Sequence, residues 1–139
     1  MSTQVIVFTN SNGNMCLCVP TGELPIEQVQ AKDIPAGTQS YIVNRNSLPN
    51  DDIDFIDAWE QTEGVVTVSF VKAKEVTKAR LRMERAPLLL AQDVAFQRAI
   101  EIGADTTAIV AEKQRLRDLP ALADTCVSLD ELRALKAVQ

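Results

Sequence analysis

With 139 residues, of which 46% are hydrophobic, the chain fits one domain or one small domain with a helical extension. Fourteen Lys and Arg residues against 19 Asp and Glu residues leave a net charge of -5, which disfavours general binding to nucleic-acid phosphates. The sequence has no histidine and therefore lacks the usual general base and a common zinc ligand. Its three cysteines include no Cys-x-x-Cys pair, and this odd number predicts a reduced compartment. No apolar run approaches about 18 residues and the start does not resemble a signal peptide, so we expect cytoplasmic synthesis and no membrane span.

Two β-rich runs near the N-terminus predict a hairpin. Gln4–Thr9 and residues 15–19 flank Asn12-Gly13, a pair that accepts the positive φ angles of a two-residue turn. In that register Phe8 faces Leu17 and Ile6 faces Val19. The opposite sheet face then carries Cys16, Cys18, Val5 and Val7. We expect the two thiols to pack against their neighbours; the alternative is a soft-metal site, for which no further ligand lies nearby in sequence.

The middle of the chain predicts two short helices and two further strands. Pro25 opens a helix over residues 25–31, with Ile26, Val29 and Ile34 on its buried side. After a Pro-Ala-Gly turn, residues 40–43 form the third strand. A Leu-Pro turn leads to a helix capped by Asn50 or Asp51, and residues 65–71 form the fourth strand.

Aromatic and acidic residues mark the helix that follows Asn50. Phe55, Ile56 and Trp59 are expected to anchor it to the sheet, and Trp59 with Phe55 and Phe8 is assigned to the N-terminal core and not to a ligand site. The helix also carries the carboxylates of Asp51, Asp52, Asp54 and Asp57. A calcium loop is one interpretation, but its glycine and terminal glutamate are missing, and the helix dipole accounts for acidic residues in a first turn.

The hydrophobic period changes from two to three-and-four at Lys72, which predicts a long helical region. Pro87 is expected to kink or restart the helix. Gly103 suits the left-handed end of that helix, and Asp105 suits the cap of the next, which stops by Leu119. The predicted apolar face of the first helix is Val76, Ala79, Met83, Ala86 and Leu90. A weaker face follows on the second helix at Ile109, Glu112, Leu116 and Leu119.

A capping box at Ser128 to Glu131 starts a closing helix with Leu129, Leu132 and Leu135 on one edge. The predicted fold class is therefore α+β, with a small four-stranded, mostly antiparallel sheet and two short helices in residues 1–71. Residues 72–139 add a C-terminal α-helical hairpin and a short terminal helix.

One basic segment stands out in this acidic protein. It spans residues 72–85 and contains the cations Lys72, Lys74, Lys78, Arg80, Arg82 and Arg85. A solvated helix face or a surface for an acidic partner is favoured over nucleic acid, because no aromatic residue is interleaved for base stacking.

Two segments resemble small proteins encoded beside the tail-fibre genes of tailed bacteriophages, a group that includes chaperone-like tail-fibre assembly proteins. The first is DIPAGTQSYIVNRNSLPNDDIDFIDAWE, similar to the group's Pro-Ala-Gly turn, Ile-Val strand, Leu-Pro turn and short helix ending in Ala-Trp. The second is RAPLLLAQDVAFQRAIEIGADTTAIVAEKQRLRDLPAL followed by SLDELRAL, similar to its Leu-rich helix, Asp-Val-x-Phe, and Lys-Gln-x-Leu-Arg-Asp close. These motifs cover about half the chain and are structural, not catalytic.

The resemblance implies a non-enzymatic protein that binds a tail-fibre or neighbouring virion component during assembly in the host cytoplasm. A minor structural protein that stays in the virion is the alternative. An enzyme is the weakest interpretation, because carboxylates without histidine or a suitable cysteine partner do not make a nucleophile and base. We therefore expect no catalytic residue, cofactor or metal.

The helical hairpin is the predicted partner-binding region. Its apolar residues spread around more than one side of the helix and cannot all face one short neighbour. Some are therefore expected to contact the N-terminal domain, a second copy of the chain or a foreign protein. The predicted binding residues are Leu88, Leu89, Phe96, Ile100, Ile102, Ile109 and Leu116.

Overall fold

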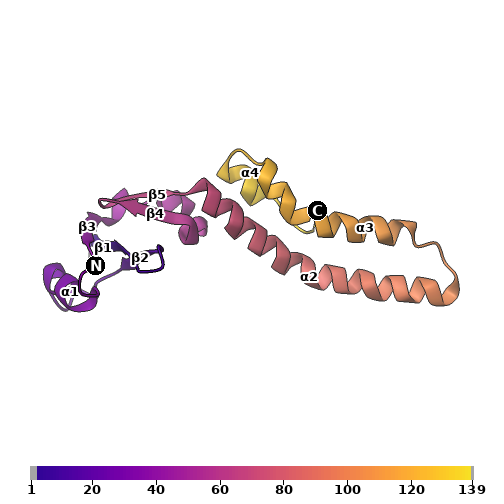
Figure 1. Ribbon diagram of the computed structural model, residues 1–139, viewed down its shortest axis with the longest axis horizontal. Helices are drawn as coiled ribbons and strands as arrows, with labels where there is room; N and C mark the ends of the chain where they lie inside the picture. The colour runs from indigo at the N-terminus through magenta and orange to yellow at the C-terminus, as the bar shows by residue number, and fades with distance from the viewer. Residues whose placement is uncertain (1–2, 139) are drawn as a thin grey trace. The chain divides into compact units, whose positions relative to one another are not determined.

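The computed structural model describes residues 3–138 and divides into two units, Met1–Lys72 and Ala73–Gln139 (Figure 1). Strands occur in the first unit, and the second consists of helices and their connections. The predicted α+β class, with a small sheet and a helical C-terminal part, is confirmed.

The N-terminal unit holds two antiparallel sheets in place of the single four-stranded sheet expected. Strands β1 (Gln4–Thr9), β2 (Met15–Cys18) and β3 (Ser40–Asn44) form a three-stranded sheet in the order β2-β1-β3. A separate hairpin pairs β4 (Trp59–Thr62) with β5 (Val65–Val68). Strand β4 was missed because Trp59 was assigned to the end of a helix, whereas it is the first residue of a strand.

The register of the first hairpin differs by one residue from the prediction. Ile6 pairs with Cys18 and Phe8 with Cys16, because the loop closes through a hydrogen bond from Asn10 N to Asn14 O at 2.9 Å and contains three residues between them. Only Gly13 of this loop has a positive φ, at 82°, so the two-residue turn with two left-handed residues is not formed. A shift of one residue moves side chains to the other face, and the two cysteines therefore share a face with Ile6 and Phe8.

The two-residue turn expected at Asn12 occurs instead between β4 and β5. Glu63 and Gly64 have φ angles of 51° and 85° and connect Thr62 to its strand partner Val65. Both positions are left-handed, as this turn type requires. A Cβ atom on Gly64 would lie 3.1 Å from Cβ of Tyr41, so glycine also permits the close approach of the turn to β3.

The main core of the N-terminal unit lies between the sheet and the β4-β5 hairpin. Val5 and Val7 pack there with Trp59 and Val66, and Leu48 completes the buried set. The placement of Trp59 in the N-terminal core is confirmed, at 2% exposure. Phe8 does not join it, since strand alternation puts Phe8 on the other face of β1.

Helices cover or flank this sheet. Helix α1 (Ile26–Asp33) has Pro25 at its N-cap and buries Val29, and Gln30 Nε2 donates to Ser40 Oγ at 2.9 Å on the sheet face of Ile6. The segment before β4 is a 3-10 helix, η2 (Asn50–Ala58), and a shorter one, η1 (Arg45–Ser47), precedes it. Phe55 of η2 is buried as expected, but Ile56 is 41% exposed and does not anchor the segment.

The C-terminal unit is a helical hairpin with a short closing helix. Helix α2 (Phe70–Ile102) is followed by α3 (Thr107–Asp118), the 3-10 helix η3 (Leu119–Thr125) and α4 (Leu129–Ala134). The end of α2 at Gly103 is confirmed, with φ 68° and a hydrogen bond from Ala104 N to Ala99 O at 2.9 Å that satisfies a terminal carbonyl. Ser128 caps α4 by accepting from Glu131 N, also as expected. Helix α2 does not restart at Pro87.

The inward face of α2 is not the predicted one. Its buried residues are Ala73, Thr77, Leu81 and Ala99. The face expected to pack inward points to the opposite side, and its Met83 is 78% exposed and its Leu90 65% exposed. The prediction was wrong because it took the face with the larger apolar side chains as the packed one. The inward face is built largely from short side chains. On α3 the predicted face is confirmed, with Leu116 fully buried.

The chain end is held against both long helices. Ala137 is fully buried beside Leu81 and Leu119, with Leu88 and Leu135 packed against them. The Ala137 N–H donates to Glu84 Oε1 at 3.2 Å, and the Ala137 carbonyl oxygen accepts from Arg115 Nη2 at 2.9 Å. A carboxylate from α2 and a guanidinium from α3 thus fix the same peptide.

Candidate functional site

The seven residues predicted to bind a partner occupy different environments. Leu116 is fully buried, and Leu88 packs against the core of the helical unit, so neither is available to a partner in this structure. Phe96 is half-buried, with Lys113 Nζ 5.1 Å from its ring centroid. Leu89 and Ile109 are half-buried as well. Ile100 and Ile102, at 56% and 80% exposure, are the two that the structure leaves open.

A continuous apolar surface lies instead on the outer side of α2. We call it the outer stripe and define it as Val76, Ala79, Met83, Ala86, Leu90 and Val94. These positions recur every three or four residues, so they line one side of the helix. At about 1.5 Å per residue, the part from Met83 to Val94 alone extends over about 16 Å. Met83, Leu90 and Val94 are 78%, 65% and 44% exposed.

The spacing of apolar residues in the sequence predicts most of this surface. Five of its six residues form the apolar face predicted for the first helix, and the structure leaves most of that face exposed. The signal for an external face was the second apolar series on the same helix. A helix with two apolar sides is contacted from two directions or leaves one side exposed.

Some cations of the basic segment form contacts within the protein. Arg80 Nη1 lies 2.6 Å from Glu84 Oε2, and Arg80 Nη2 donates to the carbonyl oxygens of Leu132 at 3.1 Å and Leu135 at 2.8 Å. Lys72 Nζ lies 3.0 Å from Glu60 Oε1. Lys72 and Arg80 therefore already have partners within the protein.

Charged contacts within and between α2 and α3 further fix the hairpin. Lys113 Nζ lies 2.7 Å from Asp93 Oδ1. Arg115 donates to Glu112 from Nε at 2.9 Å and from Nη2 at 2.6 Å, and this pair lowers the pKa of Glu112. Glu84 also has a lowered pKa, first because Arg80 donates to it and then because the Ala137 N–H does. These contacts stabilise the inward side of the hairpin.

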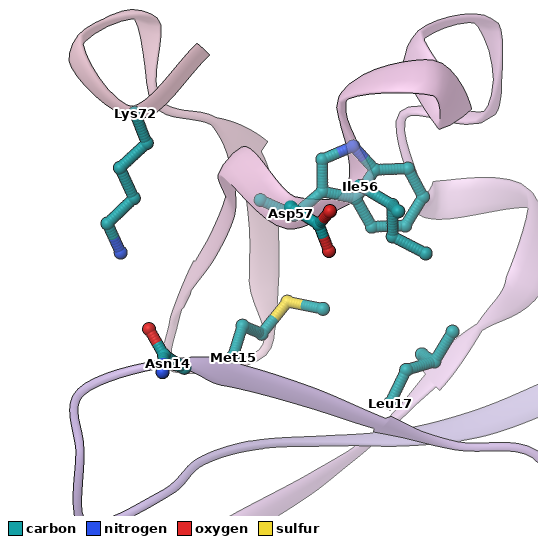
Figure 2. Close-up of a pocket in the computed structure, with 7 residues that line it drawn as sticks. Asn14, Met15, Leu17, Ile56, Asp57 and Lys72 are labelled. Atoms are coloured by element: carbon teal, nitrogen blue, oxygen red, sulfur yellow. The ribbon is translucent and has the colours of Figure 1, made fainter. Parts of the chain in front are cut away.

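The N-terminal unit contains a hollow of about 430 Å³ between β2, the end of η2 and the start of α2. Figure 2 shows Met15 and Asp57 pointing into this space from opposite sides, with Lys72 on a third side. Its wall is completed by Asn14, Leu17, Ile56 and Trp59. The lining contains no serine, cysteine or threonine, and its charged members are Asp57 and Lys72.

The thiols and carboxylates do not assemble into a metal site among residues 3–138, where no group of three or more candidate ligands was found. Cys16 and Cys18 are half-buried and Cys126 is buried, and burial raises the pKa of the Cys18 and Cys126 thiols. A raised pKa lowers the reactive thiolate fraction.

No protein-family model matches the chain, and neither a curated protein nor a solved structure is significantly similar to it. No helix within residues 3–138 is long and apolar enough to cross a membrane.

Proposed function

We propose that this chain is a non-enzymatic assembly factor that binds a tail-fibre or neighbouring tail component of a tailed bacteriophage in the host cytoplasm. The observation that carries the proposal is the outer stripe on α2. The resemblance of residues 33–60 and 85–122 to tail-fibre-associated proteins supports the choice of partner.

The exposure of the outer stripe to solvent supports a binding role. Met83 and Leu90 expose most of their surface, although α2 carries short side chains on its packed side, where larger ones would add more to stability. Scattered apolar residues on a surface need no explanation, but these are aligned along one side of a single helix. An amphipathic helix of this kind fits into an apolar groove of another protein or pairs with another helix.

The proposed activity is stoichiometric binding without turnover. Binding to a helix face needs no nucleophile, base or cofactor, and the exposed side chains of the stripe are aliphatic. The assembly factor would cover apolar surface of an incomplete tail component until that component is built into the tail.

The test is assembly of the tail-fibre protein from the same genome, expressed with and without this chain. We expect more soluble, assembled fibre when the chain is present. An equal yield in both cultures, with no complex between the two purified proteins, would reject the proposal.

Mass spectrometry of purified virions separates the assembly factor from the alternative, a minor structural protein bound through the same surface. An assembly factor is absent from finished particles. Recovery at a fixed copy number per particle would instead establish the structural role.

A further inference from the structure

The helical unit contains a second feature that the outer stripe does not explain, a hollow of about 270 Å³ lined mainly by cations. We call it the basic pocket. Its lining consists of Lys78, Arg82, Arg85, Arg117, Pro120, Ala121 and Asp124. Four cationic side chains thus surround one carboxylate, in a protein whose net charge is -5.

Two of the four cations are fixed in place by internal contacts. Lys78 Nζ lies 2.8 Å from Asp124 Oδ1, and this hydrogen bond is the main cause of the lowered pKa of Asp124. Arg85 Nη1 donates to the carbonyl oxygens of Leu116 at 3.2 Å and Arg117 at 2.8 Å. Carbonyl partners are neutral, so Arg85 is oriented without its charge being cancelled.

The other two cations are not neutralised. Arg82 lies one helical turn after Lys78 and just under one turn before Arg85, which places the three on one side of α2. No carboxylate within residues 3–138 forms an ion pair with Arg82 or Arg117, and both arginines are exposed. The cations of the pocket repel one another, and a bound anion would reduce this repulsion.

We propose that the basic pocket binds the carboxylate side chains of an acidic protein segment. Arginine forks match the planar carboxylate with two parallel hydrogen bonds, and three arginines line the pocket. Pro120 and Ala121 supply an apolar surface for the methylene groups of a glutamate. The inference rests on the proposed function, because it assigns the acidic segment to the protein partner of the outer stripe.

A nucleic acid fits these observations less well. The lining has no aromatic side chain on which a base could stack. The negative net charge of the chain repels a long phosphate backbone outside the pocket, whereas a short acidic segment needs only the local cations.

The pocket is tested by calorimetric titration of the 139-residue chain with a capped hexaglutamate peptide at low salt, with hexaglutamine as the neutral control. We expect hexaglutamate to bind and hexaglutamine not to bind. The double variant Arg82→Gln with Arg117→Gln should weaken hexaglutamate binding at least about tenfold, because charged hydrogen bonds are among the stronger ones. Arg98→Gln is the matched control, an exposed arginine of α2 outside the pocket, and should bind as the wild type does.

Three results would overturn the proposal. The first is that hexaglutamate does not bind to the wild type. The second is that Arg98→Gln weakens hexaglutamate binding as much as the double variant does. The third is that a thymidine oligonucleotide binds the wild type more tightly than hexaglutamate does and that the double variant loses this binding. Circular dichroism confirms that each variant is folded, and NMR shifts of the arginine side-chain signals in the wild type locate the peptide without any substitution. Leu90→Lys should leave hexaglutamate binding unchanged, so failure of the pocket and failure of the outer stripe are distinguishable.

Discussion

At the scale of single residues, Trp59 is the strongest test of the N-terminal core. Its side chain is 2% exposed, and Nε1–H donates to the Asp52 carbonyl oxygen at 3.2 Å. Trp59→Ala should therefore lower the free energy of unfolding of the N-terminal unit by about 3 kcal/mol, from lost burial and the cavity left behind. Chemical denaturation followed by circular dichroism measures this loss. Unchanged stability together with lost partner binding would instead make Trp59 a binding residue.

The contacts of Glu84 predict that the stability of the helical unit depends on pH. Arg80 and the Ala137 N–H donate to this carboxylate and lower its pKa in the folded protein below the ordinary value of about 4.5. A lowered folded pKa means that the stabilising contribution is complete above the ordinary pKa and is lost as the pH falls through the folded value. The thermal midpoint of the helices should therefore fall as the pH drops below the ordinary pKa of about 4.5.

The matched comparison for this prediction is Glu84→Gln against Glu101→Gln, an exposed glutamate on the same helix. Thermal unfolding is followed by far-ultraviolet circular dichroism across the pH range. Glu84→Gln should reduce the acid sensitivity of the helical unit more than Glu101→Gln does. Identical pH profiles for the two variants would show that the contacts at Glu84 do not contribute.

At the scale of elements, Pro87 gives a prediction about α2. The helix continues through this residue, so the Met83 carbonyl oxygen lacks the N–H that another residue at position 87 would supply. Pro87→Ala should restore that hydrogen bond and stabilise the helical unit by about 1–3 kcal/mol. Denaturant unfolding measures the change. A loss of stability would mean that the proline ring itself makes a packing contact that the helix requires.

The elements that local rules govern could be predicted from the sequence. Gly103 ends α2 and Ser128 starts α4 because a left-handed residue and a side-chain cap are local requirements. The hairpin register could not be predicted, since Asn12-Gly13 is compatible with loops of two or three residues, and only pairing along β1 selects between them. Strand β4 was missed because Trp59-Glu60-Gln61-Thr62 has no strong strand signal without its partner β5.

The candidate binding surface was predicted only in part. Spacing alone identifies the apolar positions on α2, but it does not say which of two apolar sides meets α3. That choice depends on tertiary contacts such as Ala137 beside Leu81. Likewise, the sequence shows a basic segment, whereas the basic pocket requires Arg117 from α3, which is distant in sequence.

At the scale of the whole molecule, the two proposed surfaces have different physical characters. The outer stripe is apolar, so its binding should be insensitive to salt and carry a negative heat-capacity change. The basic pocket binds through charge and should weaken as salt screens it. A partner that uses both surfaces would lose only part of its affinity at high salt.

The outer stripe could also bind a second copy of the chain, which light scattering of the purified protein detects. If the occupant is a tail component, the chain is monomeric alone and forms a complex when the component is added. A dimer that Leu90→Lys converts to a monomer would identify the second copy as the occupant.

The central claim is tested most directly by the affinity of the purified chain for the tail-fibre protein from the same genome, measured for Leu90→Lys and Val127→Lys. Both residues are exposed, at 65% and 81%, but only Leu90 lies on the outer stripe. Burial of a leucine contributes about 2 kcal/mol, so Leu90→Lys should bind at least about thirtyfold more weakly, while Val127→Lys binds as the wild type does. Equal affinity of both variants and the wild type would contradict the account.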